Sequence, residues 1–74
     1  MEIGYMYSKN VIQSFIRQRD MAYTIINSMG YTVLSVSIKN TKTTPKETIR
    51  LKTSSTSTEE SVIIISKNGV KLET

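Results

Sequence analysis

The sequence predicts an α+β domain in which one long amphipathic helix packs on one face of an antiparallel sheet of three to five strands. Three observations predict it: apolar residues at helical spacing in the first half, alternating or continuously apolar segments in the second half, and polar connections between those segments. The chain of 74 residues is half of a typical domain, so residues 1–74 are expected to form a single domain with the element order (β)αββββ.

The helix is predicted to run from Ser8 or Asn10 to Met29. Apolar residues recur along it at helical spacing and fall on one face. These residues are Val11, Phe15, Ala22, Ile25, Ile26 and Met29. Ser8 or Asn10 can cap the start, and Gly30 follows where a left-handed C-terminal cap is expected.

Four segments after the helix are predicted to be strands. Tyr31–Lys39 and Glu47–Thr53 alternate between apolar and polar residues, as strands with one buried face do. Ser61–Ser66 contains four consecutive aliphatic residues, which is typical of a strand covered on both faces. Asn68-Gly69 is a strong hairpin signal that leads into Val70–Leu72. Because the connections are short and polar, consecutive strands are expected to pair antiparallel.

A looser alternation over Met1–Tyr7 indicates either a short edge strand before the helix or a frayed end. The core is expected to combine the apolar helix face with the inward positions of the first two strands after the helix. It is predicted to consist of Leu34, Val36, Ile38, Ile49 and Leu51 from the strands, with Val11, Phe15, Ala22, Ile26 and Met29 from the helix.

The sequence contains neither cysteine nor histidine. Disulfides, thiolate or imidazole metal sites and the usual general base near neutral pH are therefore excluded. The six acidic residues show no spacing that would bring two of them together locally, and the adjacent Glu59 and Glu60 would point to opposite faces of a strand. We therefore expect no catalytic residue, no metal site and no cofactor, and we predict that the protein is not an enzyme.

No apolar run approaches the roughly 20 residues needed to span a bilayer. The start, Met1–Gly4, carries an early acid and no basic region before an apolar stretch, which does not match a signal peptide. We therefore expect a cytoplasmic protein without membrane contact. The chain is rich in Ile, Ser, Thr, Lys and Asn, a usage common in short proteins of AT-rich viral genomes, so a viral or mobile-element origin is a further expectation.

Basic residues gather in one stretch after the first strand. Five of them fall within fourteen residues that contain a single acid, with threonines between them. They are Lys39, Lys42, Lys46, Arg50 and Lys52. Lys39, Arg50 and Lys52 are expected to share one sheet face, and the other two to project from the connection between the strands.

Cations beside small hydroxyls suit contact with phosphates, and the net charge of +4 favours polyanions. The alternative is that these residues only keep an exposed sheet face soluble and discourage pairing at the edge.

The apolar run Val62–Ile65 predicts a partner, because a single helix can cover only one of its two faces. Alternation groups Val62 with Ile64, and Ile63 with Ile65, so one pair remains outside the helix. Ile63 and Ile65 are the residues assigned to a second copy of the chain, unless the N-terminal segment covers that face instead.

Arg19 lies inside the apolar sector of the helix. Either its stem follows the edge of the core while the guanidinium reaches water, or it contributes to partner binding by pairing with an acid or a phosphate.

The function predicted from these features is a small basic module that binds nucleic acid without strong sequence specificity and acts as a homodimer. The alternative is a protein-interaction or inhibitor module, of the kind that mobile elements direct against a host protein. In that case an apolar sheet face is the working surface.

Overall fold

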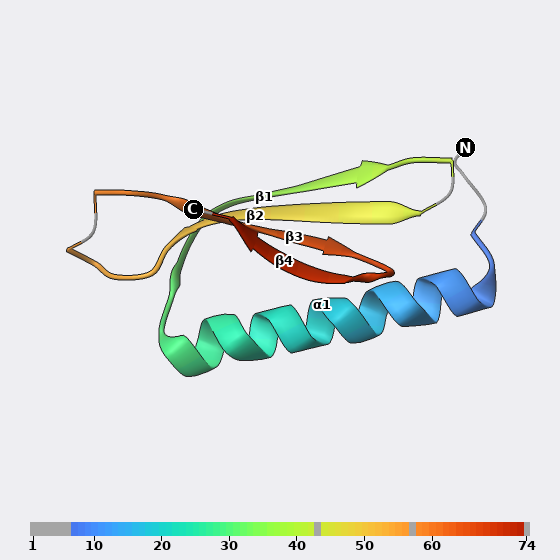
Figure 1. The fold of residues 1–74 in the computed structure, drawn as a ribbon, viewed down its shortest axis with the longest axis horizontal. Coiled ribbons are helices and arrows are strands. Elements are labelled where there is room, and N and C mark those ends of the chain that lie inside the picture. Colours follow the sequence, from blue (N-terminus) through green and yellow to red (C-terminus); the bar gives the residue numbers. More distant parts are fainter. Residues whose placement is uncertain (1–6, 43, 57, 74) are drawn as a thin grey trace.

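A computed structural model of the chain describes residues 7–42, 44–56 and 58–73. One helix, α1 (Lys9–Met29), lies along one face of a four-stranded antiparallel sheet, which gives two layers (Figure 1). The expected α+β class, with its helix on an antiparallel sheet, is thereby confirmed. The edge strand expected before the helix falls, apart from its last residue, outside the described residues.

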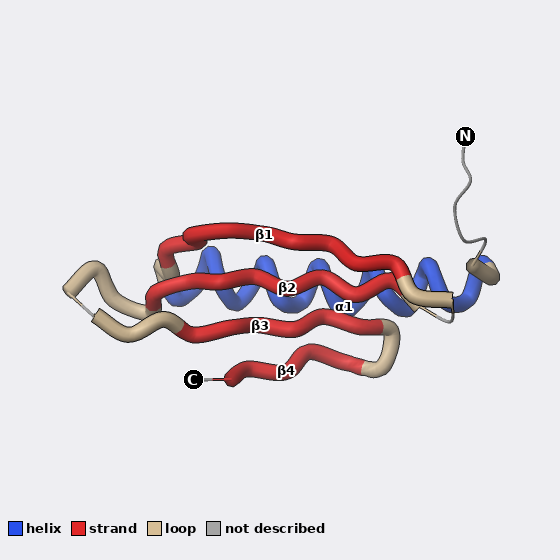
Figure 2. Tube along the Cα trace, turned by 90° about the horizontal axis from the view of Figure 1, so that it is seen from above, coloured by secondary structure: helices blue, strands red, loops and turns tan. Residues whose placement is uncertain are grey.

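The strands follow α1 and each pairs with its neighbour in the sequence, so the sheet is a meander (Figure 2). They are β1 (Thr32–Asn40), β2 (Pro45–Lys52), β3 (Ser61–Ser66) and β4 (Gly69–Glu73). The last hairpin is one residue out of its expected position, because Ser66 pairs with Gly69 and the turn consists of Lys67 and Asn68.

Both ends of α1 are formed by the capping residues that the sequence indicates. Ser8 caps the start, where its Oγ accepts a hydrogen bond of 3.2 Å from the backbone N–H of Val11. Gly30 ends the helix in the left-handed conformation, at φ 70° and ψ 29°, and the N–H of Tyr31 donates to the carbonyl of Ile26 at 3.0 Å. This Schellman geometry turns the chain back toward the sheet, so that β1 begins at once.

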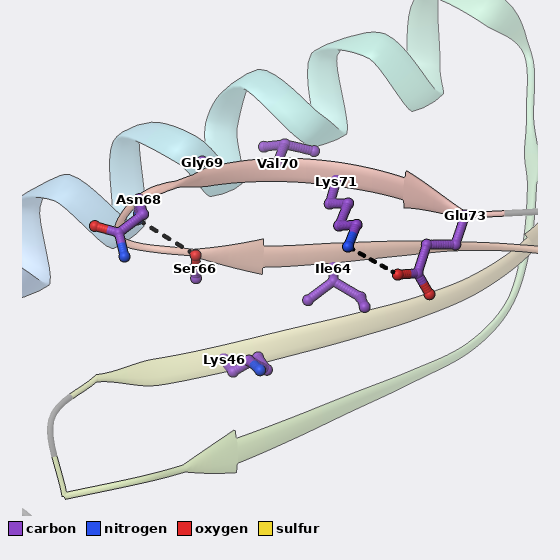
Figure 3. Close-up of a pocket in the computed structure, with 8 residues that line it drawn as sticks. All are labelled: Lys46, Ile64, Ser66, Asn68, Gly69, Val70, Lys71 and Glu73. Carbon is purple, nitrogen blue, oxygen red and sulfur yellow. Dashed lines mark hydrogen bonds and ion pairs between the residues drawn. The ribbon is translucent and has the colours of Figure 1, made fainter.

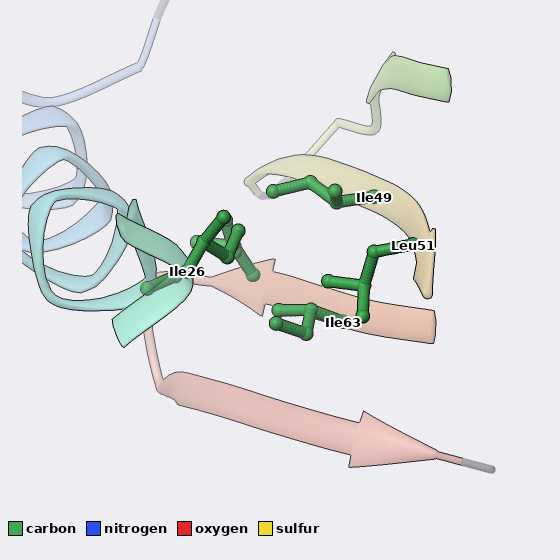
Figure 4. Close-up of a cluster of buried hydrophobic side chains, with 6 residues drawn as sticks. Ile26, Ile49, Leu51 and Ile63 are labelled. Carbon is green, nitrogen blue, oxygen red and sulfur yellow. The ribbon is translucent and has the colours of Figure 1, made fainter. Parts of the chain in front are cut away.

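The core lies between α1 and the strands β2 and β3. Six hydrophobic side chains are buried there: Ala22, Ile26, Ile49, Leu51, Ile63 and Ile65. In Figure 4, Ile26 of α1 lies near Ile49 and Leu51 of β2 and Ile63 of β3. β2 and β3 each contribute alternate residues to the core, because alternate side chains of a strand point to the same sheet face.

The expected core is wrong for β1 and for the last turn of α1. Val36 and Ile38 are 47% and 61% exposed, and Leu34 and Met29 are exposed as well. The reason is the distance between the two layers: the backbone of α1 lies close to β3 and β4, whereas β1 is the strand farthest from α1 in Figure 1. Every residue of β1 is therefore exposed.

Candidate functional site

The sheet face opposite α1, here called the outer face, carries the residues that alternate with the buried ones. Along β2, the odd-numbered positions 45–51 are buried and the even-numbered positions point away from α1. The outer face of β2 therefore consists of Lys46, Thr48, Arg50 and Lys52. Lys39 joins them from β1, because it is in register with Lys46 and directly opposed residues share a face.

Four of the five predicted basic residues are thus brought together on the outer face. Lys46, which the sequence placed in a connection, belongs to β2. Lys42 is exposed in the connection that follows β1 and lies outside the sheet. The sequence prediction missed Lys71 of β4, which is in register with the outward-facing Ile64. The polar positions alternating with Val70 after the hairpin signal were sufficient to find it.

Two of these cations have acidic partners. Arg50 Nε donates to Oε1 of Glu60 at 3.0 Å, and Lys71 Nζ lies 3.3 Å from Oε2 of Glu73. Both ion pairs are solvent-exposed, so each contributes little to stability and leaves its cation accessible.

Lys39 and Lys46 form the unusual part of the outer face. They sit directly opposite each other on β1 and β2, and neither has an acidic partner among the described residues. Like charges in this arrangement destabilise an antiparallel pair. An anion bound between the two ammonium groups would remove that repulsion.

A hollow of about 400 Å³ opens on the outer face beside the β3–β4 hairpin (Figure 3). It is lined by Lys46, Ile64, Ser66, Asn68, Gly69, Val70, Lys71 and Glu73. In Figure 3 the side chain of Ile64 lies between those of Lys46 and Lys71. The hollow therefore places the apolar surface of Ile64 between the ammonium group of Lys46 and that of Lys71, which pairs with Glu73 in the same lining.

The opposite face of β2 holds a charged group that the sequence prediction missed. Glu47 is fully buried, and its two carboxylate oxygens accept hydrogen bonds from Arg19 Nε at 2.8 Å and from the Tyr23 hydroxyl at 2.6 Å. The Arg19 guanidinium also lies 4.7 Å from the centre of the Tyr23 ring. Alternation with the buried Ile49 was the signal that Glu47 points inward.

This cluster joins α1 to β2. The hydrogen bond that Arg19 donates to Glu47 raises the pKa of Arg19. Burial, followed by the hydrogen bond that its hydroxyl donates to Glu47, raises the pKa of Tyr23. Each oxygen of Glu47 accepts a hydrogen bond from α1, so the cluster fixes the helix on the sheet and the carboxylate has no unpaired oxygen to offer a substrate.

The partner contacts assigned from the sequence must be corrected. Ile63 and Ile65 are buried beneath α1, with 3% and 0% of their surface exposed, so neither can reach a partner. The pair on the outer face is Val62 and Ile64, both half-buried. Arg19 pairs with an acid, as one reading of the sequence expected, but the acid belongs to its own chain.

Within the described part of the chain, no three acidic side chains gather in a way that could hold a metal ion. No helix there is long and apolar enough to cross a membrane. Comparison of the chain with protein families, curated proteins and solved structures finds no match. The functional argument therefore depends on the outer face alone.

Proposed function

We propose that the protein is a small nucleic-acid-binding module that contacts phosphates through its outer face, without strong sequence specificity and as a homodimer. The observation that carries this proposal is the opposed pair Lys39 and Lys46, which lack an acidic partner among the described residues. A surface that only needs charge for solubility gains nothing from two lysines placed directly opposite each other. A surface that binds phosphates does gain from this arrangement, because a phosphate held between the two lysines offsets their repulsion.

The residues around the lysine pair support the same function. Ser37 is in register with Thr48, and Ser35 with Arg50, so short hydroxyls alternate with the cations on the outer face. Small hydroxyls donate to phosphate oxygens and let the backbone of a nucleic acid approach closely. The described outer face carries no aromatic ring for base stacking, so the binding we propose reads charge and not sequence.

The test is the double variant Lys39→Gln, Lys46→Gln, compared with the matched variant Lys9→Gln, Arg17→Gln on the exposed surface of α1. Both variants remove two positive charges. The outer-face variant should weaken binding to a short duplex DNA by about tenfold or more at low salt and lower the salt slope by about two. The α1 variant should lose far less affinity for the duplex. Equal losses in the two variants would show that net charge alone drives binding, and would contradict this assignment.

A protein-interaction or inhibitor module is the second candidate function, and the exposure of β1 favours it. Val36 and Ile38 present aliphatic surface that α1 leaves uncovered, and uncovered apolar surface marks interaction sites. If the protein binds no duplex DNA even at low salt, the binding surface should be assigned to β1 instead of the outer face.

A further inference from the structure

β1 is a long strand that no other described element covers on either face. Its nine residues are all exposed, and it pairs only with β2, so the described structure leaves the backbone groups of its other edge unpaired. Long open edges of this kind pair with other strands unless charges, prolines or a bulge at the edge prevent it. β1 has one cation, Lys39, and one irregularity, between Val33 and Ser35. From Ser35 to Asn40 its register is regular.

The side of β1 that faces the α1 layer is apolar. Val36 and Ile38 are in register with the inward-facing Ile49 and Glu47, so they project toward the helix layer, where they remain exposed. The flank of α1 on that side is also apolar: Ile12 and Ile16 are exposed and share the flank from which Arg19 reaches β2. Exposed aliphatic side chains are therefore present both on the inner side of β1 and on α1.

We propose that β1 of two copies of this chain pair antiparallel about a two-fold axis at Ser37, which joins two four-stranded sheets into one continuous sheet. Directly opposed residues in an antiparallel pair share a face. At the two-fold axis, one residue must therefore lie directly opposite its own copy in the partner subunit. At Ser37, Val36 meets Ile38 of the partner subunit on the inner side, and Lys39 meets Ser35 of the partner subunit on the outer face. Within the segment from Ser35 to Lys39, apolar groups meet apolar groups and no like charges are opposed.

The neighbouring registers are poorer. An axis at Val36 would draw the irregularity between Val33 and Ser35 into the pairing. An axis at Ile38 would set Val36 against the polar Asn40. An axis at Lys39 would oppose two ammonium groups, which destabilises the pair. The strand is thus self-complementary in one register, and this self-complementarity identifies the occupant of the edge as a second copy of the chain.

The effect of this dimer on nucleic-acid binding rests on the proposed function. In this dimer the two outer faces lie side by side, with Lys39 of each copy close to the axis. Strands are spaced by about 4.8 Å, so the joined sheet is roughly 34 Å wide, close to one turn of duplex DNA. The dimer would therefore extend the row of cations from one protomer across a full helical turn.

Cysteine cross-linking tests the register, and the absence of natural cysteine makes each introduced thiol unique. Residues opposed across a two-fold axis have Cα atoms about 4.5–5.5 Å apart, within the range that a disulfide spans. Ser37→Cys should therefore form a disulfide-linked dimer on mild oxidation. Thr48→Cys, one strand further from the axis on the same face, should not.

A mixing experiment gives a stricter readout. Ser35→Cys and Lys39→Cys should each fail to cross-link with themselves but should cross-link with each other when mixed. Equal cross-linking of Ser37→Cys and Thr48→Cys, or a wild type that sediments as a monomer across a hundredfold dilution range, would overturn the proposal. A dimer that appears only when residues 1–6 are deleted would show instead that the chain's own start covers β1.

These outcomes are separate from those for nucleic-acid binding. A protein that loses DNA binding with Lys39→Gln, Lys46→Gln yet never cross-links through Ser37→Cys would retain the proposed function and lose the dimer.

Discussion

Glu47 is the residue that ties the two layers of the molecule together. A carboxylate buried without partners would be strongly unfavourable, and here both oxygens accept hydrogen bonds from α1, one from Arg19 and one from Tyr23. Because hydrogen bonds are directional, this contact sets the rotation of α1 over β2 more narrowly than aliphatic packing does. Ile12 and Ile16 are left exposed on the same flank as a result.

Glu47→Ala should therefore lower the free energy of unfolding by about 2–3 kcal/mol, because it leaves the Tyr23 hydroxyl unpaired and opens a cavity beneath α1. Glu60→Ala is the matched control, since it removes the acid of an Arg–Glu pair that is solvent-exposed and should change stability by about 0.5 kcal/mol or less. Urea denaturation measures both changes. Similar small losses in the two variants would refute a structural role for the buried pair.

At this scale the sequence predicted the outer-face cations better than the core. Lys39, Arg50 and Lys52 could be assigned to one face because alternation is a local property of a strand. The same alternation could have placed Glu47 inward, but its partners come from a helix more than twenty residues away, a distance over which local pattern carries no information. Ile63 and Ile65 could be paired with each other from the sequence, although which pair α1 covers could not be read from it.

The elements of the fold differ in how fully local signals determine them. α1 has a capping residue at its start and a glycine in the left-handed conformation at its end, so both boundaries are encoded within one turn. β1 alternates as clearly as β2, yet β2 is half buried and β1 is fully exposed. The difference arises because β1 lies farther from α1 than β2 does (Figure 1), and no signal within β1 records that distance.

Gly30→Ala tests the junction between α1 and β1. An added Cβ at this position meets no atom within 4 Å, so the cost comes from the left-handed backbone alone. We expect a loss of about 1–2 kcal/mol in the free energy of unfolding, measured by thermal or urea denaturation. Gly30→Asn should cost less, because asparagine tolerates this conformation. Equal stability of Gly30→Ala and the wild type would mean that the chain leaves the helix by another route.

Under the proposed function, the molecule as a whole carries its core on one side of the sheet and its binding surface on the other. Among the described residues, the six buried hydrophobic side chains and the Glu47 cluster lie between α1 and the sheet, whereas the outer face carries five cations, two of which pair with acids. Changes to the outer face can therefore alter binding without disturbing the core. The open edge at β1 offers a way to double that face without lengthening the chain.

The measurement that tests phosphate binding by the outer face most directly is the affinity of the wild-type protein for duplex DNA as a function of salt, from about 50 to 200 mM. If about four phosphates are neutralised for each bound copy, the logarithm of the binding constant should fall linearly with the logarithm of salt concentration, with a slope of about −3.6. A slope near zero, or no binding at the lowest salt concentration, would contradict the proposed function.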